Sequence, residues 1–277
     1  MPEKYVDLHM HTTASDSTSS PAEVLEHTLK VGLSAIAITD HDTLDGFIAI
    51  QKLNSNQDLE ILPAVELSAN YKGEDVHIIG YLMDYQDKQL LDKMQEFKRE
   101  REKRGEKMVE KLNQMGIGIS MEKVKAVAKH SVIGRPHLAD ALLQGNFTNS
   151  YDEAFIKYLG YEGPAYVAKK YLSPQEALDL IHQFKGVAVL AHPGILKKDN
   201  LIVDLIEMGL DGIEAYHSQH DYKLTNHYIN LARKLGVIYS GGSDCHGKRK
   251  GRILIGTIKV PYQCLTMLKT VQQARFG

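Results

Sequence analysis

Short apolar, β-branched runs alternate with stretches of helical periodicity, and this alternation constrains the fold more than any other feature of the chain. Runs that predict strands occur at residues 5–9, 35–39, 61–67, 76–82, 187–191, 212–216, 237–240 and 253–260. Between the first two runs, Ser20-Pro21 predicts the start of a helix and Gly32 predicts its end. Strands and helices that follow one another in this order favour a parallel sheet.

The alternation stops at about residue 84. Residues 87–115 predict one long charged helix, and shorter helices are predicted at 121–129, 136–144 and 173–184. The apolar seam of the long helix comprises Leu91, Met94, Phe97, Met108, Leu112 and Met115. An α/β barrel uses roughly 200–250 residues, so the 277 residues leave room for an insertion. We therefore expect a barrel domain formed by residues 1–84 and 171–277, and a helical insertion formed by residues 85–170.

The composition of the chain argues against several classes of protein. A net charge of -2 and a pI near 6.7 argue against a protein held to nucleic acid mainly by a basic surface. Cys245 and Cys264 are too few for a disulfide framework, which suits a reducing cytoplasm. The N-terminus has no apolar signal core, and no apolar run approaches the length of a membrane span. We expect a soluble, cytoplasmic protein with no membrane partner and no obligate protein partner.

Nine potential metal ligands lie in five short clusters, most of them where a predicted strand ends. They are His9, His11, Asp16, His41, Glu66, His77, His192, Asp244 and His246. Each cluster alone has an ordinary structural explanation. Brought together at one rim of a barrel, where barrel enzymes carry their chemistry, they would provide ligands for two or three hydrolytic metal ions.

Strand geometry supports this interpretation at the first cluster. Positions two apart in a strand point to the same side, so His9 and His11 can face one ion. Asp7 shares that parity, and its carboxylate could orient one of the ligands. Asp16 lies in a loop just beyond the strand, where an aspartate would be unremarkable by itself.

The middle clusters follow strands 35–39 and 61–67. For Asp42, which precedes a helical stretch, we favour a helix cap over a ligand. Glu66 ends one strand and His77 opens the next, so the two would meet at a common rim.

The last clusters also follow apolar strands. His192 ends the strand at 187–191, directly before a Pro-Gly turn. Asp244 and His246 share parity after Gly241-Gly242, which lets the backbone approach a neighbour closely. Cys245 points the other way, and we interpret it as a packed thiol.

At these positions the chain resembles the PHP (polymerase and histidinol phosphatase) family of metal-dependent phosphoesterases. The matching segments are Asp7-Leu8-His9-Met10-His11-Thr12, Ser15-Asp16, Thr39-Asp40-His41-Asp42, Val65-Glu66-Leu67-Ser68, Ala191-His192-Pro193 and Ser243-Asp244-Cys245-His246. The chain is most similar to stand-alone members that act on nucleoside 3′,5′-bisphosphates and 5′-phosphorylated short RNA, which share the insertion and Gly134-Arg135-Pro136-His137. Ser17 is a departure, because the family usually has glycine there.

The resemblance implies a distorted seven-stranded β/α barrel, an insertion covering the active site, and three divalent metal ions. Manganese is expected, with iron or zinc as alternatives. The first ion would be held by His9, His11, Glu66 and Asp244, the second by Glu66, His77 and His192, and the third by Asp16, His41 and His246. Three divalent ions against three carboxylates leave the pocket positive. The metals would activate a water for in-line attack on phosphorus.

Candidate substrate contacts lie mainly in the insertion. Arg135 and His137 flank Pro136 at a predicted helix start, where a phosphate could bind, although a plain capping loop has the same pattern. His217 follows strand 212–216 and could contact phosphate or act as a general acid. Lys169, Lys170 and the run 248–252 could meet further phosphates, but such runs are usually solvated loops. Base stacking or simple packing would explain Tyr161, Tyr166 and Tyr171. A structural role is expected for His27, His130, His182 and His227, and His220 is a weaker candidate than His217.

The first functional hypothesis is a metal-dependent phosphatase or exonuclease. It would convert a nucleoside 3′,5′-bisphosphate to the nucleoside 5′-monophosphate and act on 5′-phosphorylated short RNA. One alternative is a small-metabolite phosphatase of the histidinol-phosphate type. A different class is a non-catalytic, metal-stabilised module.

Overall fold

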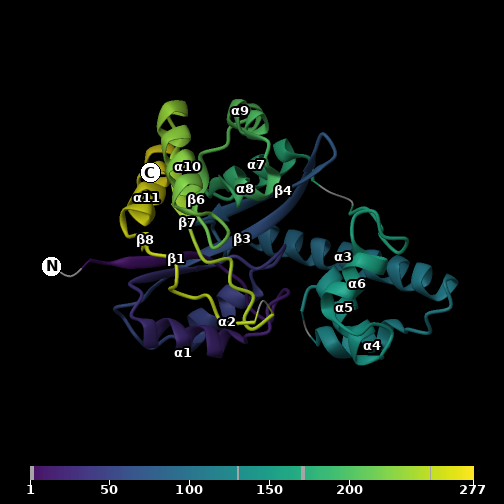
Figure 1. The fold of residues 1–277 in the computed structure, drawn as a ribbon. Helices are drawn as coiled ribbons and strands as arrows, with labels where there is room; N and C mark the ends of the chain where they lie inside the picture. Colours follow the sequence, from purple (N-terminus) through teal and green to yellow (C-terminus); the bar gives the residue numbers. More distant parts are fainter. Residues whose placement is uncertain (1–2, 130, 170–171, 250) are drawn as a thin grey trace.

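The computed structural model describes residues 3–129, 131–169, 172–249 and 251–277. Eight strands form one sheet in the order β7-β6-β5-β4-β3-β2-β1-β8 (Figure 1). The strands are β1 (Tyr5–Met10), β2 (Ala35–Ile38), β3 (Glu60–Tyr71), β4 (Glu74–Tyr81), β5 (Val187–Leu190), β6 (Gly212–Tyr216), β7 (Ile238–Gly241) and β8 (Val260–Pro261). The predicted α/β barrel is therefore confirmed, with seven longer strands and a two-residue eighth.

The sheet curls until β1 meets the segment that follows β7. The His11 backbone N–H donates to the Cys245 carbonyl (3.1 Å), and the Asp244 N–H donates to the His9 carbonyl (2.8 Å). A side chain at Gly242 would lie 2.3 Å from the His9 nitrogen, so only glycine permits this approach. The barrel is nearly closed, and its closure brings two predicted ligand clusters side by side.

The sheet is mixed, whereas the sequence pattern favoured a parallel one. The ladders β1–β2, β2–β3, β5–β6 and β6–β7 are parallel, but β4 is antiparallel to both β3 and β5. Lys72 and Gly73 join β3 to β4 with φ of 52° and 85°, the backbone of a tight hairpin without room for a crossover helix. Because β4 runs back from this hairpin, His77 lies opposite Ser68, two residues from Glu66 in β3.

The predicted strand at 253–260 is wrong except at its last residue, where β8 begins. The preceding segment uses its backbone donors on barrel side chains instead of a ladder. The Leu254 N–H donates to Cys245 Sγ (3.3 Å), and the Gly256 N–H donates to the Asp7 carboxylate (3.2 Å). An apolar, β-branched run therefore remained irregular because its hydrogen bonds were satisfied elsewhere.

Helices surround the barrel. They are α1 (Pro21–Val31), α2 (Asp45–Leu53), α7 (Pro174–Gln183), α8 (Pro193–Leu196), α9 (Asp199–Glu207), α10 (Tyr222–Leu235) and α11 (Gln263–Phe276). The predicted start and end of α1 are confirmed, since Ser20 and Glu23 form a capping box and Gly32 has a φ of 73°. In the described part of the chain, no helix combines the length and apolar character that crossing a membrane demands.

The remaining helices lie to one side of the barrel (Figure 1). They are α3 (Lys88–Gln114), α4 (Met121–Ala128), α5 (Arg135–Gln144), α6 (Tyr151–Ala154) and the π-helical turn η1 (Phe155–Leu159). Leu90 and Met94 at the start of α3 belong to the barrel core, whereas Met108 and Leu112 belong to a separate core shared with α4 and α5. Met115, predicted in the seam, is 39% exposed. One long helix thus joins two cores, and the division at residues 84/85 and 170/171 stays a prediction.

We expect Asp211→Asn to lower the free energy of unfolding by about 1–3 kcal/mol at pH 7. Asp211 accepts hydrogen bonds from the Ala188 N–H (2.8 Å), His182 Nε2 (2.9 Å) and Arg275 (2.6 Å), linking β5, α7 and α11. Burial opposes ionisation of Asp211, but these bonds outweigh it and lower the pKa of the carboxyl.

The depressed pKa sets the sign of the pH dependence. The stabilisation is present above the unfolded pKa, near 3.9, and disappears as pH falls through the folded value. Urea unfolding in EDTA should therefore show a gap between wild type and variant at pH 7 that narrows below about pH 4 and closes as pH falls through the folded pKa. Asp204→Asn, which removes an exposed partner of Lys72, is the control and should change little. An equal gap at both pH values would contradict the assignment.

Candidate functional site

Four side chains from β1, β3 and the end of β7 place one ligand atom each around a common point. His9 Nε2 and His11 Nε2 are 3.3 Å apart. The Glu66 Oε2 and Asp244 Oδ1 oxygens each lie 3.5 Å from His9 Nε2 and 3.3 Å from His11 Nε2. An ion with four ligands at about 2.0–2.2 Å separates its ligand atoms by roughly 3.3–3.5 Å. The spacing therefore fits a four-ligand metal site.

The other oxygen of Glu66 faces a second group. Glu66 Oε1 lies 2.9 Å from His77 Nδ1 and 3.0 Å from His192 Nε2. The same carboxylate therefore touches two imidazole groups on opposite sides, as a carboxylate bridging two ions would.

A third group gathers at Asp16. Asp16 Oδ1 lies 3.3 Å from His246 Nε2, and Asp16 Oδ2 lies 3.8 Å from His41 Nε2. His41 also presents Nδ1 to Glu66 Oε2 at 3.1 Å, so its ring lies between the second and third groups. The structure thus brings the nine predicted side chains together. The subsets with metal-ligand spacing differ in part from the predicted groups: they are His9, His11 and Asp244; His41, Glu66 and His77; and His11, Asp16, His41 and His246.

Hydrogen bonds fix which ring nitrogen is available at two histidines. His9 Nδ1 bonds to Glu214 (3.0 Å), and His246 Nδ1 bonds to the Asp244 carbonyl (3.0 Å). Since an acceptor takes the Nδ1 proton in each case, Nε2 is left with a lone pair directed into the site. Metal-binding histidines in proteins are usually held in this way.

Three other ring nitrogens have no hydrogen-bond partner among the described residues. They are His41 Nδ1, His77 Nε2 and His192 Nδ1, all of them buried; His217 Nε2, beside the same groups, is a fourth. Buried polar atoms in proteins are normally satisfied. His41 Nδ1 faces Glu66 Oε2 at 3.1 Å, so an ion or its water beside that carboxylate would supply the partner that this nitrogen lacks, and the donor set fits the implied metals.

The charges of the site also fit metal binding. The pKa values of Asp16, Glu66 and Asp244 lie well below the usual range. Neighbouring imidazoles outweigh the effect of burial, His246 most strongly at Asp16 and Asp244 and His41 at Glu66. Burial opposes a charge on His11, yet Asp244 and Glu66 raise its pKa to about 10. The ionised carboxylates are therefore stabilised by positive charge on the imidazoles. Bound divalent ions would supply this charge in place of the imidazole protons.

Asp40 holds the loop that carries Asp16. It accepts hydrogen bonds from the Thr12 N–H (2.8 Å), the Thr12 hydroxyl (2.7 Å) and the Ser15 hydroxyl (2.5 Å). A side chain at Gly46 would come within 1.9 Å of the Asp40 carboxylate. Ser17 has no positive φ, so the loop does not need the glycine usual in the family.

The structure refines one sequence interpretation of an aspartate and contradicts another. Asp7 acts on a predicted ligand through the backbone, since its carboxylate accepts from the Ser243 N–H (2.8 Å) and so holds the segment that leads to Asp244. Asp42 was expected to cap a helix, but α2 has no side-chain cap. Asp42 instead pairs with Arg101 Nε on α3 at 2.6 Å. The interpretation of Cys245 as a packed thiol is confirmed, since it lies in a buried core cluster.

Glu214 in β6 is a site residue that the sequence analysis missed. It is fully buried, bonds to His9 Nδ1 (3.0 Å) and accepts the His192 backbone N–H (2.7 Å). The available signal was a glutamate inside an otherwise apolar strand, since burying such a charge is costly unless it is paired.

We expect Glu214→Gln to weaken metal binding by about 10–100-fold, the usual effect of losing a partner that orients a metal ligand. The amide can donate to His9 Nδ1 and thereby favour the tautomer that blocks Nε2. The measurement is metal content after dialysis against graded chelator. Glu207→Gln, on the exposed end of α9, is the control. Unchanged metal retention would show that Glu214 has only a packing role.

His217 presents a hydrogen-bond donor to the site. The Gln219 N–H donates to His217 Nδ1 (3.1 Å), so the ring proton is on Nε2, 3.4 Å from Asp244 Oδ2. Both nitrogens of His220 are engaged, with the Ala215 carbonyl (2.8 Å) and the Gly194 N–H (3.3 Å). His217 is therefore the better placed of the two histidines to contact a substrate, as the sequence analysis predicted. Its catalytic role stays a prediction.

Arg135 and His137 begin α5, but neither contacts a predicted ligand directly. The Arg135 guanidinium lies over the Tyr161 ring at 4.5 Å, and His137 Nδ1 accepts the Gly134 N–H at 3.1 Å. Tyr161 donates to Asp75 (2.6 Å), two residues from His77. Their substrate roles therefore stay predictions. Of the other predicted positions, His130, Lys170, Tyr171 and Lys250 lie outside the described residues.

Two cations converge on Ser68 beside the second ligand group. Lys169 Nζ donates to Ser68 Oγ (2.9 Å), and so does Arg101 (3.2 Å). Ser68 is paired with His77 across β3 and β4. Burial and the neighbouring Arg101 lower the pKa of Lys169 to about 8. Both cations line a cavity of about 200 Å³. Arg101 was missed because it lies in a helix where charges are frequent.

Four polar contacts between the insertion and the barrel rim lie near predicted ligands. The Val132 N–H donates to the Ala14 carbonyl (2.8 Å), close to Asp16. Arg249, after His246, donates to Asp140 on α5 (2.8 Å). Together with the Arg101–Asp42 and Tyr161–Asp75 pairs, these contacts fix the insertion against the ligand loops.

A barrel with six imidazoles and three carboxylates at one rim defines a metal-dependent hydrolase. Comparison with known proteins identifies the family, because the PHP domain model matches residues 7–181. The chain belongs to the PHP domain family. The sequence-based predictions of this family and of a hydrolase that acts on phosphate esters are confirmed at this level.

Several relatives are similar over almost their whole length. A 5′-3′ exoribonuclease of Haemophilus influenzae is 32% identical, over 89% of this chain and 91% of its own. A phosphoribosyl 1,2-cyclic phosphate 1,2-diphosphodiesterase of Eggerthella lenta is 29% identical (92% and 98%). A 3′,5′-nucleoside bisphosphate phosphatase of Chromobacterium violaceum is 28% identical (89% and 88%). The crystal structure of a metal-dependent phosphoesterase from Bifidobacterium adolescentis matches with a TM-score of 0.87 and 28% identity, over 97% and 96% of the two chains.

Proposed function

We propose that this enzyme removes the 3′-phosphate from nucleoside 3′,5′-bisphosphates, leaving the 5′-monophosphate, and that it also hydrolyses 5′-phosphorylated short RNA. The observation that carries the proposal is Glu66, whose two oxygens face two groups of imidazoles while Asp16 gathers a third. The named activities of the relatives on nucleotides and RNA support the choice of substrate.

Three divalent ions would be held by the nine predicted ligands. His9, His11, Glu66 and Asp244 would hold the first, Glu66, His77 and His192 the second, and Asp16, His41 and His246 the third. Bound there, the ions would supply an activated water and neutralise charge on the phosphoryl oxygens. Imidazole and carboxylate ligands suit manganese, iron or zinc, with manganese as our first choice.

The protein's own groups would position the substrate. His217 would donate its Nε2 proton towards an oxygen bound near Asp244, as a phosphate contact or as the acid for the leaving group. Lys169 and Arg101 would hold a second phosphate beside Ser68, since paired cations bind phosphate with charge-assisted hydrogen bonds. Arg135 and His137 remain candidate contacts at the start of α5. The two free, buried cysteines are consistent with a cytoplasmic location.

The experiment that tests the proposal measures phosphate release by the manganese-loaded protein. Adenosine 3′,5′-bisphosphate, AMP, histidinol phosphate and a cyclic 1,2-phosphate of ribose would be compared. We expect the bisphosphate to have the highest kcat/KM and to yield AMP. Preference for histidinol phosphate or the cyclic diester would replace the proposed substrate with that class. No activity on any substrate, with metal bound, would favour a structural metal module.

A further inference from the structure

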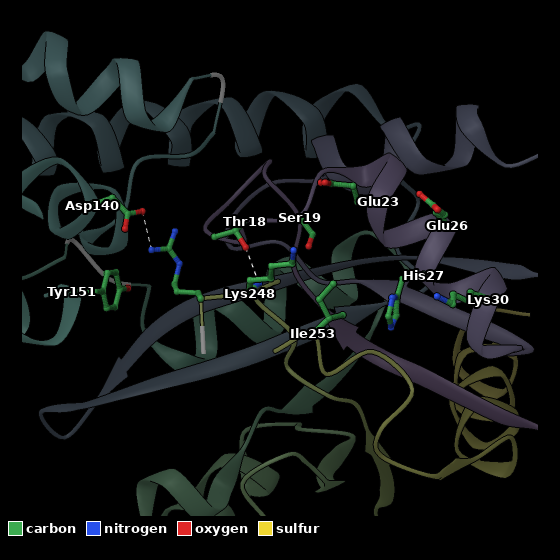
Figure 2. Close-up of a pocket in the computed structure, with 11 residues that line it drawn as sticks. Thr18, Ser19, Glu23, Glu26, His27, Lys30, Asp140, Tyr151, Lys248 and Ile253 are labelled. Atoms are coloured by element: carbon green, nitrogen blue, oxygen red, sulfur yellow. Dashed lines mark hydrogen bonds and ion pairs between the residues drawn. The ribbon is translucent and has the colours of Figure 1, made fainter. Parts of the chain in front are cut away.

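A groove begins beside the ligand loops and runs along the outside of the barrel (Figure 2). It has a volume of about 580 Å³ and is bordered by α1, by the loop after His246 and by α5 and α6 of the insertion. Resting on the proposed function, we propose that this groove binds the downstream nucleotides of a 5′-phosphorylated single-stranded RNA whose terminal nucleotide lies at the metal centre.

The groove starts at the metal-binding loops. Arg249, which lines it, donates from Nε to the Asp16 carbonyl at 3.0 Å. Thr18, also in the lining, bonds through its backbone N–H to the His246 carbonyl at 3.2 Å. A smaller cavity of about 310 Å³, lined by His137, shares Thr18, Asp140 and Arg249 with the groove. The two cavities therefore adjoin at these three residues, between the predicted substrate side of the insertion and α1.

The groove offers cations that no carboxylate occupies. Lys30 and Lys248 line it, and neither forms an ion pair with any residue that the structure describes. Of the three carboxylates in the lining, Asp140 is bound to Arg249, and Glu23 is occupied by the Ser20 N–H (2.7 Å) and hydroxyl (2.9 Å). Only Glu26 lacks such a partner among the described residues. A backbone phosphate could therefore pair with the two lysines without displacing an existing ion pair.

An aromatic group lies at the wall of the groove nearest the metal centre. The Tyr151 ring packs against the Arg249 guanidinium, 5.0 Å from the ring centre. Sites for single-stranded nucleic acid combine cations that follow the backbone with aromatic and arginine planes on which bases stack. This combination favours an oligonucleotide over a second small anion, which would need only the cations.

RNA binding in the groove can be tested with Lys30→Gln combined with Lys248→Gln, since neither residue belongs to the catalytic or metal-binding groups. The substrates are adenosine 3′,5′-bisphosphate and a 5′-phosphorylated RNA pentamer. We expect kcat/KM on the pentamer to fall roughly tenfold, with the salt dependence of binding weakened by about 1.4 in log–log slope. Turnover of the bisphosphate should stay within about twofold of wild type, because its contacts lie at the metal centre. Lys223→Gln with Lys234→Gln, on the exposed face of α10, is the matched control and should change neither substrate.

Binding of the same pentamer, labelled with a fluorophore, keeps the test independent of activity. If the wild type hydrolyses neither substrate, the proposed function fails, and the dissociation constants of wild type and double variant still decide the groove. The groove assignment is overturned if the double variant binds the pentamer as tightly as wild type. It is also overturned if both substrates lose activity equally, or if the control pair weakens pentamer binding as much.

Discussion

Glu66→Gln is expected to lower kcat/KM by well over 100-fold, more than the loss of a residue that only orients a metal ligand. The Glu66 carboxylate lies within 3.5 Å of five imidazoles, and its two oxygens serve different ligand groups. Glutamine keeps the shape but loses the charge and replaces one oxygen with a donor. An N–H group directed at an ion or at an imidazole lone pair would exclude metal from one of the groups.

The measurement pairs activity with metal content. Glu66→Gln should bind fewer ions per chain than wild type and keep its circular dichroism spectrum. Glu60→Gln makes the same change at the first residue of β3, six residues before Glu66, and should keep both metal and activity. A Glu66→Gln protein with full metal content and near-normal turnover would refute the bridging role.

His192→Asn is expected to reduce activity by more than about 100-fold while the fold is kept. His192 has a φ of 30°, in the left-handed region that a non-glycine residue adopts only at a cost. Asparagine tolerates this backbone better than alanine does, so the substitution removes the imidazole with little added strain. The variant should lose metal at the second group because His192 Nε2 faces Glu66.

This variant also separates an enzyme from a metal-stabilised module. In an enzyme, the unfolding midpoint measured in EDTA should match that of wild type, while turnover collapses. In a structural module, the main loss should be the stabilisation that added metal gives to wild type. Retained activity with reduced stability would contradict the catalytic assignment of the second group.

The sequence predicted the barrel and the ligand set because both depend on local patterns. Most strands ended where the apolar runs ended, and a histidine or carboxylate at a strand end can be recognised without its neighbours. Glu214 and Asp40 could not be assigned in this way. Their roles depend on partners that lie far away along the chain. The sequence alone does not show whether a buried carboxylate binds a metal ion or a backbone N–H.

Connection geometry explains the remaining errors. The antiparallel β4 follows from the short hairpin at Lys72 and Gly73, which the alternation of strands and helices concealed. The lost strand before β8 follows from backbone donors captured by Cys245 and Asp7. Neither effect is visible in hydrophobic periodicity, because both depend on which groups lie across the barrel.

The attachment of the insertion has a consequence for how such enzymes can be engineered. Several of its polar contacts with the barrel fall within a few residues of the predicted ligands, at Ala14, Asp42, Asp75 and Arg249. Helix α3 also shares its apolar residues between the two cores. The insertion is therefore not an independent cassette that could be exchanged between relatives to change specificity. A graft would carry over the helices of the insertion but would lose the contacts that hold the ligand loops, unless the barrel residues that receive it were transferred as well.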